Sequence, residues 1–173
     1  GQIPVINTKG INTPEEVNLQ YDFVKKAIEK SPVILLKEKL TWSVGRQTFE
    51  FPIIEILEGS YPKDSESISI RVSSEMIDFE AENLIAKIEG QRSDSSIVFS
   101  AHFDHIGKMG KATFPGASDN ASGTSMVMDL ARYYAQNKPE FDTYFLFFSG
   151  EEAGLRGSYH FVNNPAFDLS RVR

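Results

Sequence analysis

The segment TYFLFFSGEE (residues 143–152) places two adjacent carboxylates directly after a run of apolar residues. The apolar run over residues 144–148 predicts a strand that is buried on both faces. Glu151 and Glu152 repel each other, and burying either carboxylate without a partner is costly. We therefore expect a positively charged group close to the end of this strand.

A second strand and a helix precede this segment. SSIVFSAHFD (95–104) predicts a short strand, and ASGTSMVMDLARYYAQNK (121–138) carries apolar residues at helical spacing. Strand, helix and strand in this order form a βαβ unit, whose strands are parallel and joined by a right-handed crossover. The residues therefore predict an α/β fold.

Three polar clusters should meet at one edge of this sheet. Ligands of open α/β sheets bind beyond the carboxyl ends of the parallel strands. AHFDH (101–105) ends one strand, SGEE (149–152) ends the other, and GASDNASG (116–123) precedes the helix. Their convergence favours a functional site over three unrelated turns.

Each cluster has a structural explanation when it is taken alone. His102 and Asp104 lie on the same side of an extended chain and could form a structural pair, while Asp119 could cap the helix. Glu151 and Glu152 could form a solvated acidic turn. Together they indicate a divalent cation, with one glutamate as a ligand and the other as acceptor of a proton from metal-bound water. The chain has no cysteine, so a metal site must use histidine and carboxylate ligands.

Four segments together resemble the co-catalytic zinc aminopeptidases of metallopeptidase family M28. These are NLIAKIEG (83–90), IVFSAHFDHIG (97–107), PGASDNASGTSMVMDLAR (115–132) and YFLFFSGEEAGLRGS (144–158). The resemblance implies a three-layer α/β/α sandwich around a mixed, mostly parallel sheet, and two Zn²⁺ ions per complete catalytic domain. It also implies hydrolysis of N-terminal peptide bonds with a metal-bridging water and a glutamate base.

The family's motifs assign a role to each candidate residue. The resemblance implies that the metal ligands are His102, Asp119 and Glu152, with Asp119 bridging both zinc ions. It implies that Glu151 is the general base and that Asp104 orients the ligand histidine. It also implies a cis peptide bond directly after Asp119.

The family pattern continues with a later aspartate and a later histidine as metal ligands. After Glu152 this chain contains only Asp168 and His160, both outside those motifs. We therefore expect these 173 residues to be an incomplete catalytic unit, the N-terminal part of the domain. His105 and His160 match no ligand position of the family, and we interpret both as structural residues.

Residues 1–82 differ in pattern from the catalytic part at 83–173. The first region predicts a helix over 13–30 and strands over 32–38, 49–57 and 67–72. Pro52 places the second of these strands at an edge or at a strand start. Residues 31–58 resemble the later part of a protease-associated domain, which implies a smaller β-rich N-terminal region.

Composition narrows the possible partners. The net charge is −6 and no basic stripe is present, so we expect no nucleic-acid partner. No apolar run approaches the roughly 20 residues that span a bilayer, so we expect no membrane partner. We predict a peptide as the substrate and a secreted or periplasmic location, and leave the oligomeric state open.

Two other functions remain open. The first is a glutaminyl cyclase, which shares this fold and uses one zinc ion. Asn120 after Asp119, and an uninterrupted SGEEAGLRGS (149–158), resemble the peptidases more closely. The second is a non-catalytic binding homologue. Such relatives lose metal ligands, whereas each ligand position that this chain reaches is intact.

Overall fold

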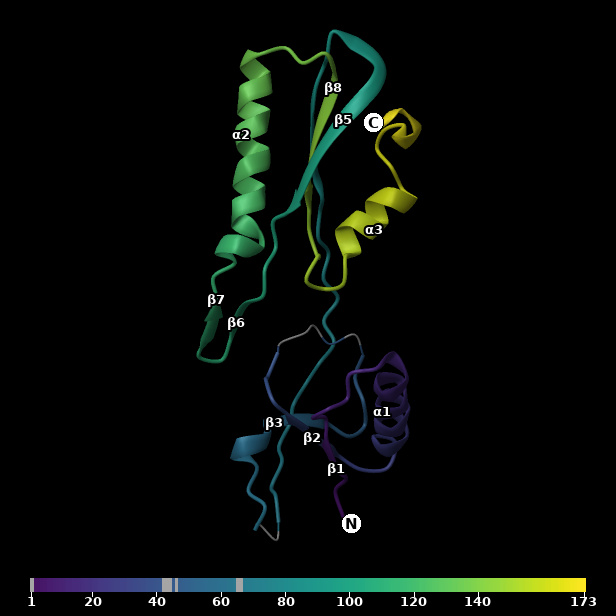
Figure 1. The fold of residues 1–173 in the computed structure, drawn as a ribbon, viewed down its shortest axis with the longest axis vertical. Coiled ribbons are helices and arrows are strands. Elements are labelled where there is room, and N and C mark those ends of the chain that lie inside the picture. Colours follow the sequence, from purple (N-terminus) through teal and green to yellow (C-terminus); the bar gives the residue numbers. More distant parts are fainter. Residues whose placement is uncertain (1, 42–44, 46, 65–66) are drawn as a thin grey trace. The chain divides into compact units, whose positions relative to one another are not determined.

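The chain divides into two compact units, Gly1–Asp78 and Phe79–Arg173. The computed structural model describes residues 2–41, 45, 47–64 and 67–173 (Figure 1). Each unit has its own sheet and its own apolar core. All motifs that predict metal chemistry lie in the second unit.

The first unit packs one helix against a three-stranded parallel sheet. The sheet order is β1-β2-β3. The elements are β1 (Val5–Asn7), α1 (Pro14–Ala27), β2 (Val33–Lys37), β3 (Ile53–Leu57) and the short helix η1 (Glu58–Ser60). Thr13 and Glu16 form a capping box at the start of α1, within the predicted helix over 13–30. Val24 and Ile28 meet Val33 and Leu35 of β2 in a small core.

The predicted strand over residues 67–72 is wrong. No helix or strand is present between residues 67 and 83, and Val72 is 58% exposed. An alternating pattern forms a strand only where a neighbouring strand accepts its backbone hydrogen bonds. By contrast, β3 starts directly after Pro52 and is an edge strand, as that proline requires.

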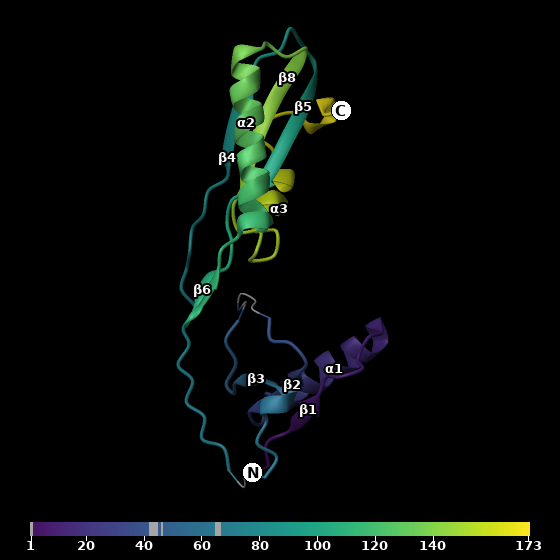
Figure 2. The ribbon, with the colours of Figure 1, turned by 60° about the vertical axis from the view of Figure 1, so that its left-hand side comes forward.

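The second unit contains the predicted βαβ unit. Its elements are β4 (Leu84–Ile88), β5 (Arg92–His102), β6 (Gly107–Met109), β7 (Ala112–Phe114), the helical turn η2 (Ala117–Ala121), α2 (Ser122–Gln136), β8 (Phe141–Phe148), α3 (Arg156–Asn163) and the short helix η3 (Leu169–Arg171). The main sheet has the order β4-β8-β5, and Figure 2 shows β4 and β5 on either side of β8. β5 and β8 are parallel and β4 is antiparallel to β8, so the sheet is mixed.

Helices cover both faces of this sheet. Phe145 is fully buried and packs with Ala101 and with Val127 of α2. Phe148 lies an odd number of residues away and faces the other side, where its ring contacts Phe161 of α3 at 5.7 Å between centroids. Figure 1 shows α2 and α3 on opposite sides of the strands. The predicted α/β/α layering is therefore confirmed, and it explains why β8 is apolar on both faces.

A buried carboxylate fixes the register between β4 and β8. Asp142 accepts hydrogen bonds from the backbone N–H of Gly90 at 2.9 Å and lies 2.8 Å from Nζ of Lys87. The hydrogen bond from Lys87, followed by that from Gly90, holds the pKa of Asp142 below its ordinary value. These contacts of Asp142 link β4 to β8 at the end of the sheet that is opposite the predicted site.

Candidate metal centre

The two parallel strands end at the same edge of the sheet. His102 is the last residue of β5 and pairs with Phe148, the last residue of β8. Oγ1 of Thr124 donates a hydrogen bond of 2.9 Å to the carbonyl of His102, which ties the first turn of α2 to the end of β5. The three polar clusters are therefore brought to one edge, as the βαβ pattern predicts.

Asp104 anchors the loop that carries the two glutamates. Its Oδ1 accepts a hydrogen bond from the backbone N–H of Glu151 at 3.0 Å. Its Oδ2 accepts one from the backbone N–H of Glu152 at 3.2 Å. A carboxylate that accepts two backbone N–H groups satisfies donors that a tight loop would otherwise leave unpaired. Asp104 therefore holds both glutamates at the strand end.

The resemblance implies that Asp104 orients His102. Two oxygen atoms of Asp104 lie near the His102 ring. Nδ1 of His102 is 3.1 Å from the carbonyl oxygen of Asp104 and 3.8 Å from its Oδ1. A backbone carbonyl that accepts from one ring nitrogen fixes the tautomer and leaves the other nitrogen as a ligand atom. The carbonyl is the nearer of the two oxygens, so the backbone of Asp104 is the closer orienting group.

The other ring nitrogen of His102 faces the carboxylates. Nε2 lies 3.1 Å from Oδ1 of Asp119 and 4.0 Å from Oε2 of Glu151. The His102 side chain is 14% exposed, whereas that of Asp119 is 67% exposed. A partly buried imidazole next to an accessible carboxylate is a suitable pair of ligands for a divalent cation. Glu151 lies at the rim of this pair.

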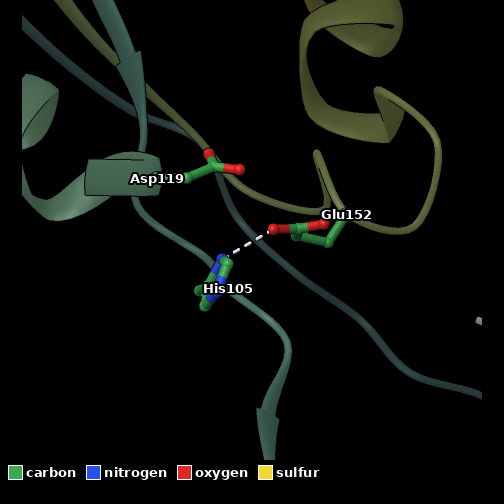
Figure 3. A group of neighbouring side chains, drawn as sticks. All are labelled: His105, Asp119 and Glu152. Atoms are coloured by element: carbon green, nitrogen blue, oxygen red, sulfur yellow. Dashed lines mark ion pairs between the residues drawn. The ribbon is translucent and has the colours of Figure 1, made fainter. Parts of the chain in front are cut away.

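Asp119 does not cap the helix. Oδ1 of Asn120, the next residue, accepts the hydrogen bond from the backbone N–H of Gly123 at 3.1 Å. The peptide bond between Asp119 and Asn120 is cis, which confirms the prediction from the resemblance. The helix-cap interpretation is thus excluded for Asp119, and its carboxylate points to the site (Figure 3).

A second group of ligand atoms shares Asp119. Among the described residues, His105, Asp119 and Glu152 each offer one ligand atom, and these atoms lie within 4.8 Å of one another (Figure 3). Nδ1 of His105 forms an ion pair with Oε1 of Glu152 at 2.7 Å, and neither buried atom has a partner outside this pair in the part of the chain that the structure describes. One imidazole and two carboxylates are ligands that a divalent cation accepts, so this group fits an added cation.

The sequence analysis interpreted His105 as a structural residue and did not group it with the candidate ligands. The structure places its ring among the metal-competent carboxylates. The ring packs against Gly116, where a Cβ would lie 2.8 Å from Cγ of His105, a contact that the sequence does not reveal. His160 lies on the exposed side of α3, and Asp168 caps η3 through the backbone N–H of Ser170. Neither of them belongs to the metal-competent group.

Replacing Asp104 with Asn should destabilise the second unit by about 1–3 kcal/mol, the usual cost of leaving a buried polar group unpaired. The Asn amide has one acceptor oxygen, so one of the two backbone N–H groups would lose its acceptor. Urea unfolding measures the change. Asp129→Asn is the matched control, because Asp129 forms only an exposed pair with Arg132 and should change stability by less than about 0.5 kcal/mol. Equal stabilities of the two variants would contradict the anchoring role.

Three comparisons relate the chain to known proteins. The family model described as Peptidase family M28 matches residues 83–173. One relative is the vacuolar membrane protease of Schizophyllum commune, which is 33% identical over 93 residues, or 53% of this chain and 10% of that protein. The vacuolar membrane protease of Schizosaccharomyces pombe is 38% identical over 87 residues, or 50% of this chain and 10% of that protein. The vacuolar membrane protease of Kluyveromyces lactis is 33% identical over 95 residues, which is 54% of this chain and 10% of that protein.

A solved structure has the same fold. The structure of BSAP, a zinc aminopeptidase from Bacillus subtilis, matches 100% of this chain and 42% of that chain, with a TM-score of 0.63 and 22% identity. The chain spans about a tenth of the length of the curated relatives named above. The structural match supports the α/β/α fold, and the protease-associated interpretation of residues 1–82 stays a prediction.

The predicted location is wrong. We predicted a secreted or periplasmic protein, whereas the curated relatives are vacuolar membrane proteases. Within residues 2–41, 45, 47–64 and 67–173, no helix combines the length and the apolar character needed to cross a bilayer.

The family match covers more than half of the chain and includes every residue of the candidate metal centre. Its four motifs occur in the order and spacing that the resemblance requires, and the three that carry polar clusters meet at one edge of an α/β/α sheet. The chain belongs to peptidase family M28.

Proposed function

We propose that the protein is a zinc-dependent aminopeptidase that hydrolyses N-terminal peptide bonds. The observation that carries the proposal is the position of Asp119, whose carboxylate lies beside Nε2 of His102 and also within 4.8 Å of ligand atoms of Glu152 and His105. A carboxylate shared between two sets of ligand atoms suits a site with two metal ions. The M28 membership supports a peptidase, and the structural relative is a zinc aminopeptidase.

Zinc would be held by His102, Asp119 and Glu152, with two ions in a complete catalytic domain. Nitrogen and carboxylate donors are the ligands that catalytic zinc sites use. Bound zinc supplies a Lewis acid that polarises the scissile carbonyl and lowers the pKa of a nearby water. Two contacts support these roles: Oε1 of Glu152 lies 2.7 Å from Nδ1 of His105, and the carbonyl oxygen of Asp104 lies 3.1 Å from Nδ1 of His102.

Glu151 is the proposed general base. Its Oε2 lies 4.0 Å from Nε2 of His102, beside the ligands, and its side chain is 34% exposed. A carboxylate in this position can accept the proton that the attacking water loses and pass it to the leaving amine. Asp104 accepts a hydrogen bond from the backbone N–H of Glu151 and so holds the loop that carries this carboxylate. This division of roles accounts for two adjacent glutamates.

The decisive experiment compares three substrates with the metal-loaded protein. We expect hydrolysis of an aminoacyl 4-nitroanilide with a free amino group, and loss of that activity on chelation and its return with Zn²⁺. We expect no cleavage of the N-acetylated substrate and no cyclisation of a peptide with N-terminal glutamine. Cyclisation alone would identify a glutaminyl cyclase. Zinc binding without any turnover would favour a non-catalytic homologue.

A further inference from the structure

His105 and Glu152 form a close ion pair at the candidate metal centre. Nδ1 of His105 and Oε1 of Glu152 lie 2.7 Å apart, and both atoms are buried. At this distance an aligned N–H and carboxylate would form a strong charge-assisted bond. The two side chains form an ion pair (Figure 3), and neither atom has a partner outside this pair among the described residues. A cation that takes the place of the proton between them would meet two ligand atoms at once.

Asp119 offers a third ligand atom beside those of His105 and Glu152. One of its carboxylate oxygens lies within 4.8 Å of a ligand atom of each of these two residues and comes from a different segment, the turn before α2 (Figure 3). Ligand atoms on a tetrahedral zinc ion are roughly 3.4 Å apart, given metal–ligand distances near 2.1 Å. The 2.7 Å pair is closer than this, so the two side chains would have to move slightly apart to hold one ion. One nitrogen and two carboxylate oxygens would then surround a cation.

The fold also holds the His105 ring in place. The hairpin of β6 and β7 pairs Gly107 with Phe114 and so returns the chain to the histidine. Gly116 follows with φ of +67°, and a Cβ there would lie 2.8 Å from Cγ and 2.9 Å from Cδ2 of the ring. Glycine at this position leaves room for the imidazole and adopts a conformation that other residues rarely adopt. A ring that is held before binding loses little entropy when it becomes a ligand.

We propose that Nδ1 of His105 is a direct ligand of the cation that Glu152 and Asp119 hold. The inference rests on the proposed zinc site and adds a nitrogen ligand that neither the motif positions nor the comparisons assign. Nε2 of His102 lies 3.1 Å from Oδ1 of Asp119, so each of the two histidines would share this carboxylate as a neighbour when metal is bound. A divalent cation that accepts nitrogen and oxygen ligands, such as Zn²⁺ or Co²⁺, suits this set.

Imidazole ¹⁵N NMR of the wild-type chain tests this ligand directly. The chain has three histidines, and the exposed His160 in α3 is an internal reference. On titration with Zn²⁺ we expect Nδ1 of His105 and Nε2 of His102 to take the chemical shift of a metal-bound nitrogen, and His160 to stay unchanged. A response of His102 alone, or Nδ1 of His105 remaining protonated when zinc is bound, would overturn the inference and leave the zinc site intact. No response from either histidine would overturn the zinc site as well.

Calorimetry on variants supplies the second measurement. His105→Gln should weaken binding of the zinc ion at Glu152 by more than the roughly 10–100-fold that loss of an outer partner costs. His160→Gln is the matched control, because it removes an exposed histidine of the same unit, and its zinc affinity should equal that of the wild type. Equal affinities of His105→Gln and wild type would overturn the inference. The NMR result decides the matter if the variant does not fold.

Discussion

Replacing Glu151 with Gln should lower kcat on an aminoacyl substrate by roughly 10²-fold or more, the usual scale for the loss of a general base. Gln has nearly the same shape as Glu but cannot accept a proton from water. The backbone N–H of residue 151 donates to Asp104 and does not depend on the side chain, so the loop should keep its position. Zinc content, measured by elemental analysis, should stay near that of the wild type.

The control for this prediction is Glu140→Gln. Glu140 is exposed and forms only a surface pair with Arg92 at 3.5 Å, so the variant should keep both zinc and turnover. If Glu151→Gln keeps wild-type turnover, the residue is not the base. If that variant loses zinc instead, Glu151 is a ligand, and the roles assigned to the two glutamates are reversed.

Glu152→Gln should lose zinc affinity by more than about 10–100-fold, since it removes an anionic ligand and not merely an outer partner. Oε1 of Glu152 is buried beside Nδ1 of His105, where a neutral amide would replace the charge that attracts the cation. Activity should be low at stoichiometric zinc and should partly recover with excess zinc. Calorimetry and kcat at both zinc concentrations measure the two effects.

The pair of variants separates the chemistry of adjacent residues. A ligand defect responds to added metal, whereas a base defect does not, because the metal is already bound in Glu151→Gln. If neither substitution changes zinc binding or turnover, the two glutamates form a solvated acidic turn. The 34% exposure of Glu151 and the 20% exposure of Glu152 agree with the first role at the rim and the second within the ligand group.

Local sequence patterns predicted a helix and a strand of the second unit. The periodicity of residues 121–138 predicted α2, and the apolar run over 144–148 predicted a strand covered on both faces. Both predictions succeed because the face of a helix or strand on which a residue lies determines whether that residue is buried. The crossover connection makes β5 and β8 parallel, so both strands end at the same edge of the sheet.

The same kind of pattern failed for residues 67–72. Their alternation is typical of a half-exposed strand, but no described strand pairs with them. Backbone pairing depends on a partner that is distant in sequence, and periodicity carries no information about that partner. The sequence therefore predicted which residues could form a strand, but not which of them pair with a neighbouring strand.

The βαβ pattern was enough to predict an α/β fold and the edge at which the carboxylates gather, and the resemblance of four motifs implied the family and the layered sheet. Only the tertiary structure decided which atoms meet there. Asp104 accepts from the backbone 47 and 48 residues further along the chain, and His105 lies 2.7 Å from Glu152 although it occupies no ligand position of the family. Such contacts depend on side-chain direction over a few ångströms, which the packing of three loops sets together and no single segment encodes.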